Sequence, residues 1–177
     1  MQEYIKQAKL YIEENRTSGS ISRAELLNQF VNESLRYADP EIEYSGATQL
    51  RNQLYSQGRP VMLGEFIEGN TGVCREFAAC MHVLMADNGK PNYMTIGDVN
   101  SVSGSADPNP GRHAWVEYID TKTNMWMVAD PTSGFVLPRD EAYSDKYLGV
   151  KNVKHEVFVW PKQTPNIQRL LKYITAN

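Results

Sequence analysis

Cysteine is scarce in this sequence, whose 177 residues include only Cys74 and Cys80. If both lie on one helix, they are about 9 Å apart along its axis, whereas a disulfide needs Cα atoms within about 7 Å of each other. Two cysteines at this spacing are also a poor zinc site. We therefore expect two free thiols, which fits a reducing compartment or one reactive and one buried thiol, and we expect no metal or other cofactor.

Long apolar runs and an excess of positive charge are missing as well. No apolar run approaches the roughly 18 residues of a transmembrane helix. Residues 1–15 lack the apolar block of a signal peptide, although processing could have removed one. The 18 Lys and Arg residues are outnumbered by 21 Asp and Glu residues, which gives a net charge of −3. We therefore expect neither a nucleic-acid partner nor a membrane partner.

The composition that remains is that of a globular protein. It has 41% hydrophobic and 22% charged residues and predicts one domain over residues 1–177. Ser22 and Glu25 have the spacing of a capping box at a helix start. Apolar residues at helical spacing predict helices over residues 4–14, 22–37, 48–55 and 73–86. Residues 1–60 are therefore expected to form a helical N-terminal part.

The second half of the chain changes from helical to alternating patterns. These patterns predict strands over residues 93–96, 114–119, 125–128 and 155–160, and a final helix over 165–174. Residues 99–111, rich in Ser, Gly, Pro, Asn and Asp, are typical of a surface loop. Because helices come first and strands follow, we expect an α+β fold with helices packed on an antiparallel sheet.

Cys74 follows Gly72 and lies in the first turn of a predicted helix. The helix dipole and the unpaired N–H groups at such a position favour a thiolate over a thiol, and the same N–H groups can hold an oxyanion. The alternative is a small apolar residue that only fills the helix start.

His113 and Asp130 lie at the ends of two predicted strands that are joined by a polar turn. In an antiparallel hairpin the start of the first strand and the end of the second lie side by side, so the carboxylate can orient the imidazole. Taken alone, His113 could be a satisfied surface histidine and Asp130 part of an ordinary Asp-Pro turn. If a helix presents Cys74 to this pair, the three residues form a catalytic triad.

These residues belong to three blocks, Gly-Val-Cys-Arg-Glu-Phe-Ala at 72–78, His-Ala-Trp-Val-Glu at 113–117 and Val-Ala-Asp-Pro-Thr-Ser-Gly at 128–134. Their order and spacing resemble the transglutaminase-like superfamily of papain-fold cysteine enzymes, in its compact bacterial form. The resemblance implies a papain-like or transglutaminase-like catalytic core over residues 69–137. It also implies Cys74 as the nucleophile, His113 as base and acid, and Asp130 as the residue that orients the ring.

Members of this family break an amide through an acyl-thioester and pass the acyl group to an amine or to water. The resemblance therefore implies a protein substrate with an accessible glutamine, and transglutaminase or deamidase chemistry. A cysteine peptidase or amidase of the same fold is the alternative, and a non-catalytic binding module is a third reading that the three intact residue types argue against. Small relatives of this family imply a toxin or effector domain, cytoplasmic or delivered into a target cell, which an inhibitory or immunity protein would cover, and the compact chain fits this expectation.

The sequence departs from its relatives in two respects. Animal transglutaminases carry a tryptophan before the nucleophile that helps to hold the oxyanion, whereas no tryptophan precedes Trp115 here. Papain-like relatives use an upstream glutamine instead, for which the candidates are Gln49, Gln53 and Gln57. The animal enzymes also bind calcium, but no twelve-residue acidic calcium loop is present in this sequence, so we expect no calcium dependence.

For the other residues with reactive side chains we expect structural roles. We expect Cys80 to be a buried thiol, His82 a residue of the helix face, and His155 a structural residue at a strand start. We expect Arg75 and Glu76 to form a salt-bridged helix start. We expect Trp115 to pack in the core beside the site, and the alternative for Trp115 is a wall for the acyl chain.

Overall fold

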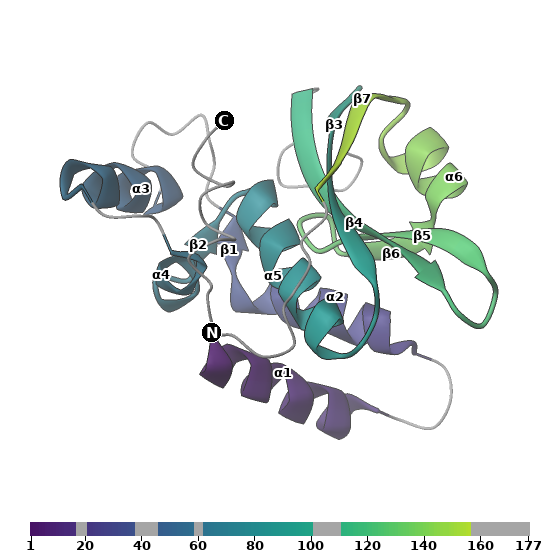
Figure 1. Ribbon diagram of the computed structural model, residues 1–177, viewed down its shortest axis with the longest axis horizontal. Helices are drawn as coiled ribbons and strands as arrows, with labels where there is room; N and C mark the ends of the chain where they lie inside the picture. Colours follow the sequence, from purple (N-terminus) through teal and green to yellow (C-terminus); the bar gives the residue numbers. More distant parts are fainter. Residues whose placement is uncertain (17–20, 38–45, 59–61, 101–110, 157–177) are drawn as a thin grey trace.

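The computed structural model describes residues 1–16, 21–37, 46–58, 62–100 and 111–156. Its centre is a five-stranded sheet in the order β6-β5-β4-β3-β7, in which every neighbouring pair is antiparallel (Figure 1). The strands are β3 (Asn92–Val99), β4 (Gly111–Asp120), β5 (Met125–Asp130), β6 (Phe135–Pro138) and β7 (Val150–Glu156). The mixed helical and antiparallel architecture confirms the predicted α+β class.

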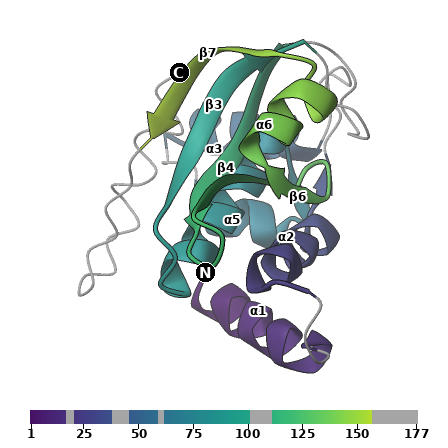
Figure 2. The same ribbon diagram turned by 90° about the vertical axis from the view of Figure 1, so that its right-hand side faces the viewer.

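Helices cover both faces of the sheet (Figure 2). One face carries α1 (Gln2–Asn15), α2 (Arg23–Ser34) and α5 (Cys74–Asp87), and the other carries α6 (Arg139–Glu141) and the π-helical turn η1 (Ala142–Lys146). Two further helices, α3 (Gly46–Ser56) and α4 (Leu63–Glu68), form a small apolar cluster beside the start of α5. The short strands β1 (Arg36–Tyr37) and β2 (Thr71–Gly72) pair in parallel.

The central helix α5 places the larger hydrophobic core on the sheet face that also carries α1 and α2. Ten consecutive residues of α5, from Glu76 to Met85, are buried, as expected for a helix that is enclosed by other elements rather than lying on a surface. The helix packs against β4, α2 and β3. Its N-terminus, which carries Cys74, is thereby fixed relative to the strand that carries His113.

Strand β4 is buried on both faces, and its alternation separates two environments. The helix-side core takes Ala114, Val116 and Tyr118. The opposite side chains, which face α6 and η1, are those of His113, Trp115 and Glu117. The chemically capable residues of this strand therefore share one face, as the spacing of His113 and Trp115 predicts.

Most predicted elements are present, and the differences concern their ends. The predicted helix over 22–37 stops at Ser34, because Leu35 is extended and residues 36–37 join β2. The predicted strand over 155–160 begins five residues earlier, at Val150, where it pairs with β3. Residues 157–160, the predicted helix over 165–174 and most of the predicted loop over 99–111 lie outside the described residues. Helix α4, strand β6 and the α6–η1 segment were not predicted.

Gly97 marks a close approach between strands. It pairs with His113 on β4, and the pairing of β3 with β7 shifts register around it. A Cβ atom at this position would lie 2.8 Å from Cη2 of Trp115, closer than non-bonded carbon atoms approach. The absence of a side chain lets the Trp115 ring lie over β3.

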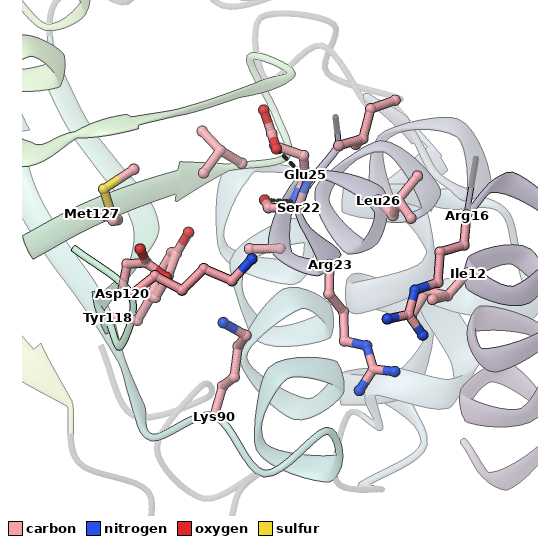
Figure 3. Close-up of a pocket in the computed structure, with 14 residues that line it drawn as sticks. Ile12, Arg16, Ser22, Arg23, Glu25, Leu26, Lys90, Tyr118, Asp120 and Met127 are labelled. Carbon is pink, nitrogen blue, oxygen red and sulfur yellow. Dashed lines mark hydrogen bonds between the residues drawn. The ribbon is translucent and has the colours of Figure 1, made fainter. Parts of the chain in front are cut away.

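A cavity of about 510 Å³ lies between the N-terminus of α2 and the turn that joins β4 to β5 (Figure 3). It is at the far end of β4 from His113, since the lining residues of this strand are Tyr118 and Asp120. Within the described ranges, no helix has both the length and the apolar character that a bilayer crossing requires.

Candidate active site

Cys74 is the first residue of α5, and its side chain is half-buried. The chain reaches this point through Gly72, where a Cβ atom would lie 3.0 Å from Cβ of Glu76. Val73 is extended and acts as the N-cap. As a residue of the first helical turn, Cys74 has a backbone N–H with no intrahelical partner. The thiol and a free N–H donor are thus presented together at the positive end of the helix dipole.

Glu76 anchors this helix start. Its side chain is buried and its Oε2 accepts a hydrogen bond from the Val73 backbone N–H at 3.0 Å. Its Oε1 pairs with Nη2 of Arg51 at 3.2 Å and with Nη2 of Arg75 at 3.1 Å. These contacts confirm the predicted salt-bridged helix start and add Arg51, which comes from α3. They hold the segment that carries Cys74 against its neighbours.

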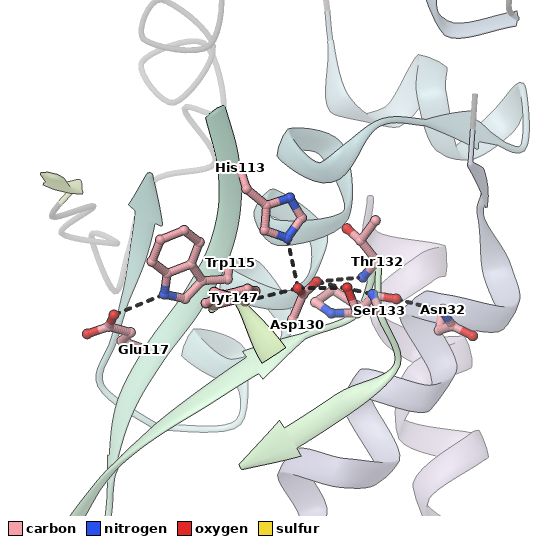
Figure 4. A network of polar contacts seen from close by, with 9 residues as sticks. Asn32, His113, Trp115, Glu117, Asp130, Thr132, Ser133 and Tyr147 are labelled. Atoms are coloured by element: carbon pink, nitrogen blue, oxygen red, sulfur yellow. Dashed lines mark hydrogen bonds and ion pairs between the residues drawn. The ribbon is translucent and has the colours of Figure 1, made fainter. Parts of the chain in front are cut away.

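His113 and Asp130 form a buried pair across the β4–β5 hairpin (Figure 4). The two strands pair with Val116 opposite Ala129, so His113 and Asp130 are diagonal neighbours on one face. His113 Nε2 lies 2.8 Å from Asp130 Oδ2. The side chains of His113 and Asp130 are 4% and 0% exposed. The structure thus brings together the two strand-end residues as the sequence predicts.

Asp130 accepts hydrogen bonds from several groups besides His113. Its Oδ1 accepts from the backbone N–H of Thr132 at 3.0 Å and of Ser133 at 3.2 Å. Its Oδ2 accepts from the Ser133 hydroxyl at 3.0 Å and from the Tyr147 hydroxyl at 2.9 Å. These donors fix the carboxylate and compensate its removal from water.

Cys74 contacts the same histidine. The Cys74 side chain lies close enough to His113 to raise the pKa of the imidazole. Because Nε2 is bonded to Asp130, Nδ1 is the ring nitrogen that remains for the thiol. Cys74, His113 and Asp130 therefore form one continuous chain of contacts from α5 through β4 to β5. This is the arrangement that the three sequence blocks predict.

The charges and hydrogen bonds around these three residues favour an ionised His113–Asp130 pair. Burial alone would raise the pKa of Asp130, but the charge and hydrogen bond of His113, with hydrogen bonds from Tyr147 and Ser133, hold it below its usual range. Burial alone would lower the pKa of His113, but the Asp130 carboxylate and then the Cys74 side chain raise it to about 10. An imidazolium between the Cys74 sulfur and the Asp130 carboxylate is thus the favoured state of His113 near neutral pH.

Aromatic side chains surround the imidazole of His113. Trp115 is fully buried and stacks on His113 with ring centroids 6.0 Å apart and planes at 25°. Tyr147 approaches His113 edge-on at 5.6 Å. The Trp115 indole N–H donates to Oε1 of Glu117 at 2.9 Å, and the Tyr143 hydroxyl donates to the same oxygen. Trp115 therefore packs in the core beside the site, as predicted, and limits rotation of the ring.

Several site residues carry no recognisable sequence signal. Tyr147 reaches Asp130 from the segment that follows η1, and no spacing rule connects it to the strand. Asn32 of α2 donates to the Pro131 carbonyl at 2.6 Å and so holds the turn after Asp130. Ser133 is the exception, because a hydroxyl three residues after an Asp at a strand end is a common turn signal.

The remaining candidates are placed away from the nucleophile. Cys80 is fully buried, which raises the pKa of its thiol, and both cysteines are free, as predicted. His82 is buried with its Nδ1 2.6 Å from Oδ1 of Asn92, and burial lowers its pKa. His155 lies near the end of β7 rather than at a strand start, 3.3 Å from Glu117.

The three upstream glutamines come from the region of α3. Gln49, Gln53 and Gln57 are all exposed, on α3 or directly after it. Within the part of the chain that the structure describes, no three His, Cys, Asp or Glu side chains gather to form a metal site. The side chains of Cys74, His113 and Asp130 offer a nucleophilic sulfur and a group that donates and accepts protons, and the start of α5 adds a backbone N–H donor.

Comparison with known proteins matches the chain to one family. A family model described as the transglutaminase-like superfamily matches residues 7–131. LapG from Legionella pneumophila has a similar structure, with a TM-score of 0.52 and 15% sequence identity over 98% of this chain and 93% of LapG. Its calcium-bound form also gives a TM-score of 0.52 at 15% identity, over 98% of this chain and 97% of LapG. No curated protein matches the chain in sequence.

Another solved structure shares part of this chain. A candidate cysteine protease from Cytophaga hutchinsonii matches with a TM-score of 0.47 and 16% identity over 92% of this chain. The match covers 54% of that protein, so the chain spans about half of its length.

Proposed function

The chain belongs to the transglutaminase-like superfamily, and we propose that it is a cysteine-dependent enzyme that transfers or hydrolyses the acyl group of protein glutamine side chains. The observation that carries this proposal is the contact chain from Cys74 through His113 to Asp130. A buried His–Asp pair beside a half-buried thiol at a helix start combines the parts that nucleophilic catalysis needs. Hydrolysis would make the enzyme a deamidase, and transfer to an amine a transglutaminase.

In the first half of the reaction, the Cys74 sulfur attacks the carboxamide carbon of the substrate glutamine. The carbonyl electron pair moves to oxygen, and the Cys74 backbone N–H stabilises the resulting oxyanion, a type of contact worth about 3 kcal/mol per donor. When the C–N bond breaks, the His113 imidazolium gives its proton to the leaving nitrogen, so that ammonia departs. Cys74 is then joined to the acyl group as a thioester.

In the second half, neutral His113 takes a proton from water or from a primary amine as that nucleophile attacks the thioester. The C–S bond breaks and Cys74 is released. Water yields a glutamate side chain, and an amine yields a substituted amide. Asp130 keeps the ring oriented in both halves and stabilises the imidazolium whenever it forms.

A cysteine peptidase or amidase would use the same residues. It would differ only in the leaving group, which would be a main-chain amine instead of ammonia. The choice of glutamine follows from the resemblance of the three sequence blocks to transglutaminases. A role as a toxin or effector, with an inhibitory partner protein over the site, is a prediction that rests on the small relatives of this family.

The proposal is tested by incubating the protein with a cell lysate and a tagged primary amine, and reading the modified residues by mass spectrometry. Cys74→Ala is the matched inactive variant, and Cys80→Ala controls for loss of the other thiol. We expect tag incorporation or glutamine-to-glutamate conversion that requires Cys74 and not Cys80. New peptide termini that depend on Cys74, without either glutamine change, would establish the peptidase instead.

A further inference from the structure

The cavity at the N-terminus of α2 is separate from the proposed catalytic residues. It is lined by Tyr118 and Asp120 of β4 and by the first residues of α2. Five residues separate Tyr118 from His113 along an extended strand, which corresponds to about 16 Å. Its volume of about 510 Å³ lies in the range of small-molecule sites. The proposed acyl-transfer function makes no use of this cavity.

The rim of the cavity is positively charged. Its four cationic side chains are those of Arg16, Arg23, Lys90 and Lys122. None of the four forms an ion pair with another residue of the described ranges, in which the paired cations belong to other sites. Lys90 Nζ lies 5.5 Å from the centroid of the Tyr118 ring, and its charge is one of the influences that lower the pKa of Asp120. In a chain with a net charge of −3, four cations around one cavity create a local positive potential that attracts anions.

The two carboxylates of the cavity are engaged in local turns. Glu25 accepts the Ser22 backbone N–H at 2.6 Å. Asp120 accepts the backbone N–H and the hydroxyl of Thr123 at 3.2 and 2.9 Å. With four cations and two carboxylates among the lining residues, the cavity keeps a net charge of +2.

Neutral hydrogen-bond donors converge on the same space. In α2 the backbone N–H groups of Arg23 and Ala24 have no intrahelical partner, and both residues line the cavity. Tyr118 is only 3% exposed, and its hydroxyl forms no hydrogen bond with a described residue. Figure 3 shows Tyr118 and Lys90 on one side of the cavity and the start of α2 on the other. A phenol hydroxyl without a protein partner at the wall of a cavity is available to donate to a ligand.

The floor of the cavity is apolar. Ile12, Ala24 and Leu26 are buried core residues that also line it, and Met127 and Val136 complete the floor. An inorganic anion would leave this surface exposed to water, whereas an organic anion would cover it. Four cations favour a dianion over a single carboxylate.

We propose that this cavity binds a small organic phosphate monoester. Its phosphate would lie between Lys90, Lys122 and the N-terminus of α2, where helix N–H groups and cations both favour negative charge. Tyr118 would donate its hydroxyl to the phosphate, and the organic group would lie on the apolar floor. The proposal is independent of the acyl-transfer function.

The test is isothermal titration of phenyl phosphate into the full chain. We expect a dissociation constant of about 1 mM or lower, and weaker binding of both inorganic phosphate and phenol. Lys90→Ala with Lys122→Ala should weaken binding at least about tenfold, since two charge-assisted contacts are lost. Tyr118→Phe, which keeps the buried ring, should weaken it about fivefold through loss of one hydrogen bond. The matched control, Lys6→Ala with Lys151→Ala, removes two exposed lysines outside the cavity and should leave binding unchanged.

Three results would overturn the proposal. The first is no saturable binding up to about 10 mM phenyl phosphate, and the second is equal affinity in the Lys90/Lys122 variant and its control. The third is binding to phosphatidate vesicles that phenyl phosphate does not displace, which would place the ligand in a membrane. Circular dichroism of each variant ensures that a loss of binding is not a loss of folding.

Discussion

The Asp130 carboxylate accepts five hydrogen bonds while fully removed from solvent. A buried carboxylate is stable only when donors and an opposite charge replace water. His113 supplies the charge, and Tyr147, Ser133 and Thr132 supply the remaining donors. The folded state therefore favours the ionised His113–Asp130 pair, and the stability of the protein depends on pH.

The pH dependence has a definite sign. Because the pKa of His113 is raised to about 10, above its value of about 6.5 in an unfolded chain, its protonation stabilises the fold fully below about pH 6.5. This contribution is lost as the pH rises through the folded pKa. Because the pKa of Asp130 is lowered, its contribution is present above about pH 4 and is lost as the pH falls.

We therefore predict that the difference in free energy of unfolding between the native protein and His113→Gln is largest between about pH 4 and 6.5. It should shrink steadily as the pH rises toward 10, because protonation then no longer favours the native fold. Urea unfolding monitored by circular dichroism at several pH values measures this difference. A difference that stays constant from pH 6.5 to 10 would mean that His113 is not the titrating group.

Tyr147→Phe tests the least predictable contact of the site. It removes one donor to Asp130 but keeps the ring that packs against His113 and Trp115. We expect a loss of about 1.5–3 kcal/mol in the free energy of unfolding, as for a hydrogen bond to a charged group. Tyr55→Phe, at an exposed tyrosine, is the control and should change stability by less than about 0.5 kcal/mol. Equal effects in the two variants would show that the Tyr147 hydroxyl does not stabilise Asp130.

At the scale of elements, the parts that position Cys74, His113 and Asp130 could be predicted from sequence. The α5 helix has strong apolar periodicity and a stop at Asn88-Gly89, and β4 and β5 are joined by a short polar turn. These signals are local, so they can be detected in a single sequence. Their relative placement followed from one topological rule, that the outer ends of a hairpin lie together.

The elements that could not be predicted depend on tertiary contacts. Strand β1 has two residues and exists only because Arg36 and Tyr37 meet β2. The turn η1 follows the three-residue helix α6, and its packing is organised around the buried Ala142 and Tyr147. Short segments of this kind carry too few residues to show a period. Their conformation is set by the sheet face that they cover.

The anchoring of the start of α5 by Glu76 can be tested by substitution. Glu76→Ala removes the cap on Val73 and leaves Arg51 and Arg75 without their buried partner. We expect a loss of about 3 kcal/mol in the free energy of unfolding, from the broken ion pairs and the cap together. Glu25→Ala is the matched control, because Glu25 forms the same kind of capping box on α2 in an exposed setting. Its expected loss is about 1 kcal/mol, and similar losses in both variants would contradict the anchoring role of Glu76.

At the scale of the whole molecule, the sheet is enclosed by two apolar clusters. The larger lies under α1, α2 and α5, and the smaller under α6 and η1. The site lies where they meet, since Cys74 packs against the first and Trp115 and Tyr147 belong to the second. Both halves of the chain must therefore be folded for the three residues to come together.

This arrangement predicts one cooperative unfolding transition for residues 1–177. Far-ultraviolet circular dichroism, which follows the helices, and tryptophan fluorescence, which includes the buried Trp115, should give the same midpoint in urea. Two separate midpoints would instead divide the chain into a helical unit and a sheet unit that fold independently.

The central claim is that Cys74 is activated by His113. It is tested most directly by the rate at which iodoacetamide alkylates each cysteine at about pH 6.5, read by peptide mass spectrometry. An ordinary thiol is only about 1% ionised at this pH, so removing its histidine partner should have a large effect. The account predicts that Cys74 reacts at least about tenfold faster in the native protein than in His113→Ala, with buried Cys80 unmodified in both as an internal control of folding. Equal rates at Cys74 in the two proteins would contradict it.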